Sequence, residues 1–188
     1  MNFLPIMKPR SGSGGFTLVE LLVVIAIISV LAVLGFGNYV NSIRRSRDAS
    51  RKSDLGNMVS ALRLYYNDRG AYPCGNGSFQ MLGCPANPPR NTACNWGTDL
   101  FGYGSDVFTP QLPKDPQSAV NQYRYYSVPA AASCTPGTGA TQFMVGAFLE
   151  AADDPGIKAS QAKCATVAAS VGVSFTGALA NMYVVCAY

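Results

Sequence analysis

The chain has 188 residues, a formal net charge of +4 and no histidine. This weakly basic balance gives no general reason to expect a nucleic-acid partner. Without histidine, the chain lacks the commonest general base and a frequent zinc ligand. It also contains no Gly-x-Ser-x-Gly nucleophile elbow and no phosphate-binding glycine loop. We therefore expect no enzymatic activity and no cofactor.

The N-terminal part of the chain consists of a short leader, residues 1–15, and an apolar run, residues 16–37, in which Glu20 is the only charged residue. About 22 helical residues at about 1.5 Å each extend roughly 33 Å, enough to cross the hydrocarbon core of a bilayer. A carboxylate inside such a segment is costly and usually has a partner. Cleavage between Gly15 and Phe16 would create that partner, because the new α-ammonium would lie one helical turn before Glu20.

A close resemblance to a known signal is carried by the string Gly15-Phe16-Thr17-Leu18-Val19-Glu20, which follows a basic leader and opens an apolar helix. It resembles the class III signal of type IV pilins and type II secretion pseudopilins. In that family an inner-membrane prepilin peptidase cuts after the glycine and methylates the new N-terminus. The resemblance implies cleavage after Gly15, N-methylation of Phe16 and a role for Glu20 in assembly. An ordinary secretory signal, cut at Gly35-Phe36-Gly37, is the alternative.

The same resemblance implies a function and a location. The chain would be a structural subunit of a type IV pilus-like or type II secretion pseudopilus filament, assembled through packing of N-terminal helices. It would be a single-pass protein of the bacterial inner membrane before assembly and part of a periplasmic or extracellular filament afterwards. Its partners would be copies of itself and other pilins, the prepilin peptidase, the inner-membrane assembly platform and the lipid bilayer. The alternative is a minor pilin, a tip adhesin with a binding loop over residues 71–121, or a DNA-uptake module.

The helix is expected to continue through residues 38–70 as an amphipathic segment. Its apolar residues recur at spacings of three and four, which is typical of a helix face packed on a core. They are Leu55, Met58, Val59, Leu62, Tyr65 and Tyr66. Gly70 is the expected helix stop. Gly35 and Gly37 mark the expected bend or melting point, since glycine weakens a helix.

Five basic residues follow the apolar run within a few helical turns. They are Arg44, Arg45, Arg47, Arg51 and Lys52. Contact with lipid phosphates or with acidic groups of neighbouring subunits is the favoured interpretation. DNA capture is the alternative, but the cluster would lie near the core of a filament, out of reach of DNA. The cluster also conflicts with the positive-inside rule, so the expected orientation depends on the cleavage signal.

Residues 71–188 are expected to form a disulfide-containing globular region. The six cysteines all lie there: Cys74, Cys84, Cys94, Cys134, Cys164 and Cys186. An even number of cysteines outside the cytoplasm indicates disulfides. Cys164 with Cys186 is the preferred pair, and the other four are expected to pair among themselves.

The predicted fold class is α+β and pilin-like. A long N-terminal helix, with a transmembrane first half, would carry a small antiparallel sheet on its C-terminal half. Three β-favouring runs, residues 122–128, 141–149 and 181–188, supply the strands. Residues 71–121 are expected to form a long cross-linked loop region. Residues 153–178 are compatible with a loop and short helix or with an extra strand.

One further segment resembles a motif of major pseudopilins. Leu112-Pro113-Lys114-Asp115-Pro116, followed by Tyr123-Arg124-Tyr125, is a degenerate form of their Asp-Pro-Trp-Gly-x-x-Tyr-x-Tyr pattern. Those proteins also bind calcium in a late loop, and Asp153-Asp154 after Glu150 could supply similar oxygen ligands. A solvated acidic turn is the preferred interpretation, so no metal site is predicted.

Overall fold

The structure is a computed structural model, and it describes residues 15–84, 92–117, 123–129 and 139–187. Side chains of residues 34–38 lie outside this description, as do residues 1–14 of the predicted leader. The chain divides into two units, Met1–Ser42 and Ile43–Tyr188. Each unit is considered by itself.

Helix α1 runs from Leu18 to Arg69 and confirms the predicted long N-terminal helix. A carboxylate lies in its first turn and a guanidinium in its last, an arrangement that complements the helix dipole. The helix ends at Gly70, whose backbone has a positive φ of 72° and whose N–H donates to the Tyr66 carbonyl at 2.7 Å. Glycine adopts this left-handed cap without steric cost, as the sequence predicts.

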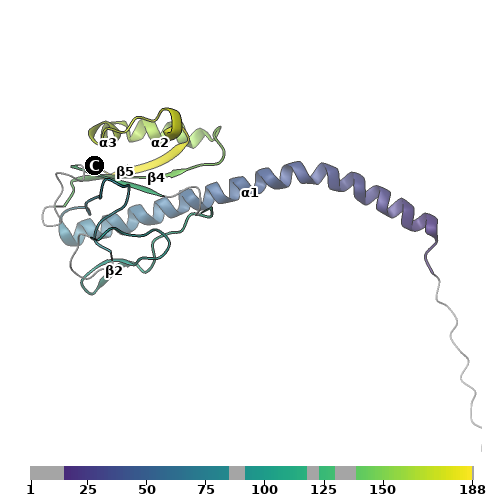
Figure 1. Cartoon of the computed structure of the whole chain (residues 1–188), viewed down its shortest axis with the longest axis horizontal. Helices are drawn as coiled ribbons and strands as arrows, with labels where there is room; N and C mark the ends of the chain where they lie inside the picture. The colour runs from purple at the N-terminus through teal and green to yellow at the C-terminus, as the bar shows by residue number, and fades with distance from the viewer. Residues whose placement is uncertain (1–14, 85–91, 118–122, 130–138, 188) are drawn as a thin grey trace, which may run out of the picture. The chain divides into compact units, whose positions relative to one another are not determined.

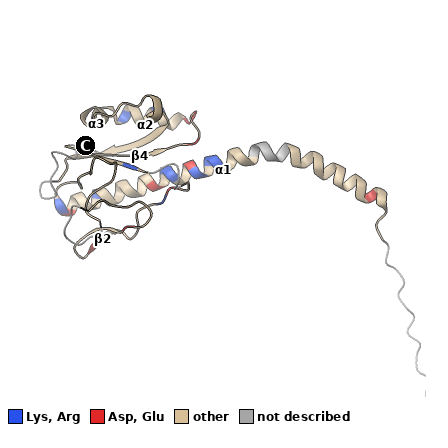
Figure 2. Cartoon of the chain, in the orientation of Figure 1, with Lys and Arg blue, Asp and Glu red and all other residues tan. Residues whose placement is uncertain are grey.

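In the first unit, the apolar side chains of α1 are exposed. Among its large apolar side chains between Leu18 and Val33, the exposed fraction ranges from 51% at Val23 to 77% at Leu18. Glu20 is the acidic residue of the first turn, and Figure 2 shows an acidic residue at the start of this apolar stretch. The helix is unbroken through Gly35 and Gly37. Within the described part of the chain, no helix has both the length and the apolar character needed to cross a membrane. The transmembrane position of residues 16–37 stays a prediction.

The second unit is built on a three-stranded antiparallel sheet of order β3-β4-β5. Its strands are β3 (Arg124–Val128), β4 (Gln142–Phe148) and β5 (Met182–Ala187). Tyr125 of β3 lies opposite Val145 of β4, which lies opposite a valine of β5. The three predicted β-favouring runs are therefore confirmed, because each contains one strand.

The sheet lies between two helical layers (Figure 1). The C-terminal half of α1 packs on one face, while α2 (Pro155–Lys163) and α3 (Ala165–Ser170) cover the other. In β4, Phe143 joins the core beside α1, whereas Met144 joins the core beneath α3. Successive side chains of a strand point to opposite faces, so one strand serves both cores. The ambiguous segment 153–178 is thus largely helical, with a short 3₁₀ turn at Gly177–Leu179.

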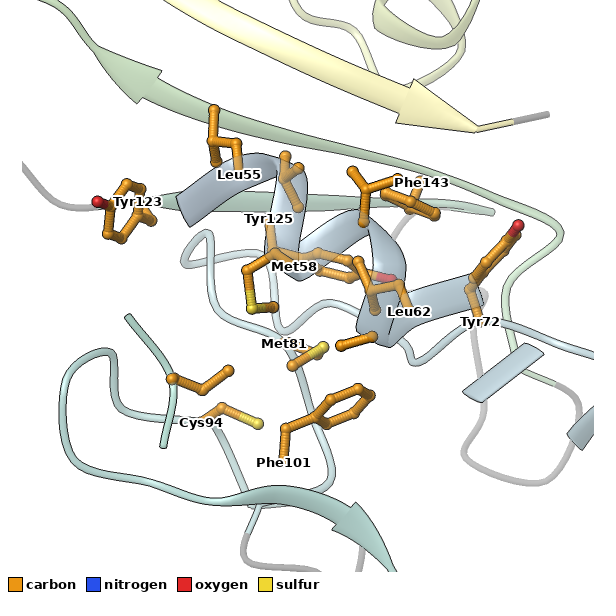
Figure 3. Packing of buried hydrophobic residues seen from close by; sticks show 14 of the residues in the cluster. Leu55, Met58, Leu62, Tyr72, Met81, Cys94, Phe101, Tyr123, Tyr125 and Phe143 are labelled. Atoms are coloured by element: carbon orange, nitrogen blue, oxygen red, sulfur yellow. The ribbon is translucent and has the colours of Figure 1, made fainter. Parts of the chain in front are cut away.

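The main core lies between α1 and the sheet (Figure 3). Leu55, Met58 and Leu62 of α1 are at most 1% exposed and pack with Tyr125 and Phe143 of the sheet. This confirms the predicted apolar stripe at these positions.

Tyr66 departs from that stripe. It is 41% exposed, and its ring stacks on Tyr72 with 4.6 Å between centroids. Its assignment to the buried face is therefore wrong, because a spacing of four from Leu62 carries the side chain to the edge of the packed face.

Leu62→Ala is expected to lower the free energy of unfolding by about 2–5 kcal/mol, because it removes a fully buried side chain and leaves a cavity. The matched control is Leu64→Ala. Leu64 is 55% exposed, so this change should alter stability by about 0.5 kcal/mol or less. Urea unfolding of the full chain in detergent, followed by near-ultraviolet circular dichroism, measures both. Equal losses in the two variants would contradict the assigned core face.

Residues 71–121 contain a second antiparallel sheet that the sequence did not predict. Its strands are β1 (Phe101–Tyr103) and β2 (Asp106–Thr109). The ring of Tyr65 on α1 lies 5.3 Å from that of Phe101 and 5.5 Å from that of Phe108. The hairpin thus covers the last turns of α1. Strands this short do not show enough alternation to be recognised in a glycine-rich segment.

Candidate processing and assembly site

The Gly15–Phe16 peptide bond lies just before α1, in exposed, non-helical chain. Apart from its chain neighbours, no described residue has a heavy atom within 4 Å of the position that a Cβ would take at Gly15. The side chain of Phe16 is 89% exposed. Exposed chain outside regular structure is the usual target of proteolysis, so this bond is open to a peptidase.

Thr17 and Glu20 cap the start of α1 reciprocally. The Glu20 N–H donates to Thr17 Oγ1 at 3.2 Å, and the Thr17 N–H donates to Glu20 Oε2 at 2.9 Å. The Thr17 hydroxyl donates to the same carboxylate oxygen at 2.8 Å. This capping box satisfies N–H groups that the first helical turn leaves without partners. It also turns the Glu20 carboxylate toward the N-terminal end of the helix, where cleavage would place the α-ammonium of Phe16.

The sequence interpretation assigned no role to Thr17. The spacing Thr-x-x-Glu directly before an apolar helix is the signal that identifies a capping box. Thr17 is therefore a positioning residue for the Glu20 carboxylate, and it lies within the motif that carries the family resemblance.

In the second unit, a buried guanidinium connects α1 with two later segments. Arg51 is 0% exposed. Its Nε and one terminal nitrogen each donate to Asp115 at 3.0 Å, a two-point contact typical of strong arginine–carboxylate pairs. Its other terminal nitrogen donates to Asp48 at 2.7 Å and to Glu150 at 2.9 Å. Arg47 adds a second cation to Glu150, with its Nε 2.6 Å from Oε1.

Two acidic partners of Arg51 also accept hydrogen bonds from backbone N–H groups. Asp48 accepts hydrogen bonds from the N–H groups of Glu150 and Ala151, each at 2.9 Å, so α1 fixes the chain that leaves β4. Asp115, the acidic residue of the pseudopilin-like motif, accepts from the Gln117 N–H at 2.7 Å. The motif resemblance therefore coincides with a structural anchor between a loop and α1.

A second ion pair lies beside this network. Lys52 donates to Asp154 at 2.6 Å, and Asp154 caps α2 by accepting from the Gly156 N–H at 2.8 Å. Asp153, next to it, is exposed. Within the described residues, no group of three or more His, Cys, Asp or Glu side chains could hold a metal ion. Of the two oxygen donors considered for calcium, Asp153 and Asp154, the second contacts Lys52.

These contacts correct the interpretation of the basic cluster. Arg47, Arg51 and Lys52 pair with acids of their own chain, and the fully buried Arg51 has no surface left for lipid phosphates, DNA or neighbouring subunits. Arg44 and Arg45 are exposed. Figure 2 shows basic and acidic residues following each other along this part of α1. The spacing of Asp48 and Arg51, three residues apart on a helix, was the local signal of pairing.

These hydrogen bonds and ion pairs shift the pKa of Glu150, Arg51 and Asp154. Hydrogen bonds from Arg47 and Arg51 lower the pKa of Glu150 to about 2, against the opposing effect of burial. Burial disfavours the charged form of Arg51, yet its hydrogen bonds to Asp115, Glu150 and Asp48 raise its pKa overall. The hydrogen bond from Lys52 lowers the pKa of Asp154. Glu150, Arg51 and Asp154 are thus charged at neutral pH.

The stability that ionised Glu150 contributes is expected to disappear in acid. Its pKa is about 2 in the folded chain and 4.5 ordinarily, so the contribution is complete above about pH 4.5 and is lost as the pH falls toward 2. Thermal unfolding between pH 6 and pH 2 should therefore show a smaller drop in Tm for Glu150→Gln than for the unaltered chain. Asp68→Asn, which changes an exposed carboxylate, is the control and should follow the unaltered chain. Parallel curves for all three proteins would contradict the prediction.

The disulfides agree with the predicted pairing. Cys164–Cys186 joins the end of α2 to β5, and Cys84–Cys94 links two positions of the first loop region. Cys74 is buried and also disulfide-bonded. Cys134 lies outside the described residues. The two described bonds confirm Cys164 with Cys186, and they confirm a pair among the other four cysteines.

Comparison with known proteins gives consistent matches. The family model for the prokaryotic N-terminal methylation motif matches residues 10–36. The type II secretion system core protein G of Vibrio cholerae is 30% identical over 123 residues, which cover 64% of this chain and 75% of that protein. The protein of the same name from Escherichia coli is 32% identical over 111 residues, covering 58% of this chain and 70% of that protein.

A pilus protein matches to a similar extent. The type IV major fimbrial protein FimA of Dichelobacter nodosus is 32% identical over 114 residues, covering 59% of this chain and 70% of that protein. No solved structure matches the chain significantly. The long helix, the small antiparallel sheet and the methylation motif define the pilin class of fold. The chain belongs to the family of type IV pilins and type II secretion pseudopilins.

Proposed function

We propose that this chain is a structural subunit of a type IV pilus-like or type II secretion pseudopilus filament. In this proposal it is cut after Gly15, N-methylated at Phe16 and assembled through packing of its N-terminal helices. One observation carries the proposal. Glu20, the single carboxylate of the apolar stretch 16–37, is held by Thr17 toward the exposed Gly15–Phe16 bond.

The exposed apolar side chains of α1 account for two successive locations of the subunit, first in the membrane and then in the filament. Large apolar side chains between Leu18 and Val33 that are 51–77% exposed in the isolated chain need apolar surroundings, because their contact with water is unfavourable. The inner membrane supplies these surroundings before assembly, and the helices of other pilin subunits supply them in the filament. The prepilin peptidase and the inner-membrane platform act between the two stages.

In the filament, the Glu20 carboxylate would be removed from both water and lipid headgroups. An ionised group that is buried without a partner is strongly disfavoured. The α-ammonium created at Phe16, from the same or a neighbouring subunit, is the proposed partner. Cleavage therefore supplies the charge that makes burial of Glu20 tolerable.

Within the second unit, the sheet is fixed to the C-terminal half of α1. The Arg51 network and the main core both hold the sheet to this helix. A filament subunit of this design transmits the packing of its helix to the domain that it carries. The alternative of a tip adhesin gains no support from Trp96, which is half-buried and packs against Tyr123 with 5.5 Å between ring centroids.

The mature N-terminus tests the proposal. Mass spectrometry of protein purified from its native membrane should find a chain that starts at Phe16 and is heavier by one methyl group. Gly15→Leu should leave the precursor uncut and serves as the control for peptidase dependence. A chain starting near Asn38 would mean conventional secretion and would contradict the filament function.

A further inference from the structure

A cavity of about 330 Å³ lies in the second unit, beside the edge strand β3. The loop around Phe79 forms one side, and the turn that follows α3 forms the other. Its volume falls within the range of small-molecule sites, about 300–1,000 Å³. The lining combines aromatic and apolar groups with one cation, and it includes Phe79, Arg124, Tyr126, Val173, Ser174 and Leu179.

Phe79 is held in an unusual conformation at this cavity. Its φ is +66°, in the left-handed region that bulky residues rarely adopt. Its carbonyl accepts from the Tyr125 N–H of β3 at 2.8 Å. The Asn76 side chain fixes the same loop by accepting from the Ser78 and Gln80 N–H groups at 2.8 and 3.0 Å. The ring nevertheless stays 39% exposed, and strained residues of this kind gather at binding sites.

Arg124 supplies a positioned cation. Its guanidinium lies 4.3 Å from the ring centroid of Phe79 and 4.8 Å from that of Phe148. Within the described residues, no carboxylate forms an ion pair with Arg124, whereas Arg51 reaches three. Aromatic rings hold the flat faces of a guanidinium and leave its N–H edge available for a planar anion.

Tyr126 adds an unsatisfied hydroxyl. Its ring lines the cavity and lies 5.4 Å from that of Phe79. Its hydroxyl is buried and has no hydrogen-bond partner among the described residues. Buried hydroxyl groups in folded proteins nearly always have a partner, so this hydroxyl is an exception in the wall of the cavity.

We propose that this cavity binds a monocarboxylate with an apolar body. The carboxylate would contact Arg124, and the apolar body would lie against the rings of Phe79 and Tyr126. A monoanion fits best because the lining offers one cation among aromatic and apolar groups. Two sources share this chemistry, a free small organic acid and the C-terminal carboxylate of a peptide. Binding of either depends on the second unit alone and goes beyond filament assembly.

Calorimetric titration of the full chain in detergent tests the proposal with two pairs of probes. Benzoate represents the free acid, and benzamide is its neutral analogue. N-acetylphenylalanine represents a peptide terminus, and its amide is the neutral analogue. We expect at least one of the two carboxylates to bind at least tenfold more tightly than its amide, and the carboxylate that does so identifies the source. Titration of empty detergent micelles provides the blank.

Arg124→Gln should weaken carboxylate binding at least tenfold, because it removes the cation and leaves a side chain of similar size. Arg63→Gln, at an exposed arginine of α1, should leave binding unchanged. Ser174→Glu places a negative charge, the same sign as the ligand's carboxylate, at an exposed position of the cavity rim. It should also weaken carboxylate binding without disturbing the core. Near-ultraviolet circular dichroism checks that each variant is folded. Equal affinity for carboxylates and amides, or unchanged binding in folded Arg124→Gln and Ser174→Glu, would overturn the proposal.

Discussion

Glu20→Ala is expected to leave cleavage after Gly15 largely intact and to reduce filament assembly by at least a hundredfold. The cleavage site precedes the helix and stays exposed, so the peptidase substrate is unchanged. Assembly would lose the proposed ion pair between the carboxylate and the new α-ammonium. Removing one member of a buried pair typically costs about 3–5 kcal/mol, and every 1.4 kcal/mol is a factor of ten in an association constant.

Two further variants separate the charge of Glu20 from its capping role. Glu20→Gln keeps a side chain that can complete a capping box with Thr17, yet it carries no charge. Thr17→Ala removes the cap and keeps the carboxylate. If the ion pair controls assembly, Glu20→Gln should fail like Glu20→Ala, and Thr17→Ala should retain more assembly than either. The measurements are the mass of the processed chain and the yield of sheared filaments. Normal filament yield in Glu20→Gln would refute the pairing.

Arg51→Leu is expected to lower the free energy of unfolding of the second unit by about 3–5 kcal/mol, because it leaves buried carboxylates without their cation. Arg51 is fully buried and contacts Asp48, Asp115 and Glu150. Arg63→Leu is the matched control on the same helix, since Arg63 is exposed, and it should change stability by about 0.5 kcal/mol or less. Denaturant unfolding of the full chain in detergent provides the comparison.

The pH dependence of Arg51→Leu offers a second measurement. Without the guanidinium, Glu150 loses one of the hydrogen bonds that lower its pKa, so the stability difference from the unaltered chain should shrink as the pH falls from about 4.5 toward 2. A difference that stays constant between pH 7 and pH 3 would show that Arg51 acts through packing instead of charge.

Features encoded within a few residues could be predicted from the sequence. The apolar run after Gly15, the position of Glu20 and the stop at Gly70 set the course of α1. Alternation over short runs located all three strands of the main sheet. These signals are local, because helix and strand periodicity repeats every few residues. The family itself was recognisable from six consecutive residues for the same reason.

Long-range pairing was decided by the tertiary structure. Asp115 and Glu150 lie 64 and 99 residues from Arg51, and nothing in the local sequence indicates that they meet it. The structure likewise paired three of the five residues of the basic cluster with acids of the same chain and placed a short hairpin on Tyr65. A charge acquires its role from the groups that folding brings within hydrogen-bonding distance. The sequence by itself therefore determined the helix, the main strands and the processing signal, and only the packed chain determined which charges are buried, paired or left open.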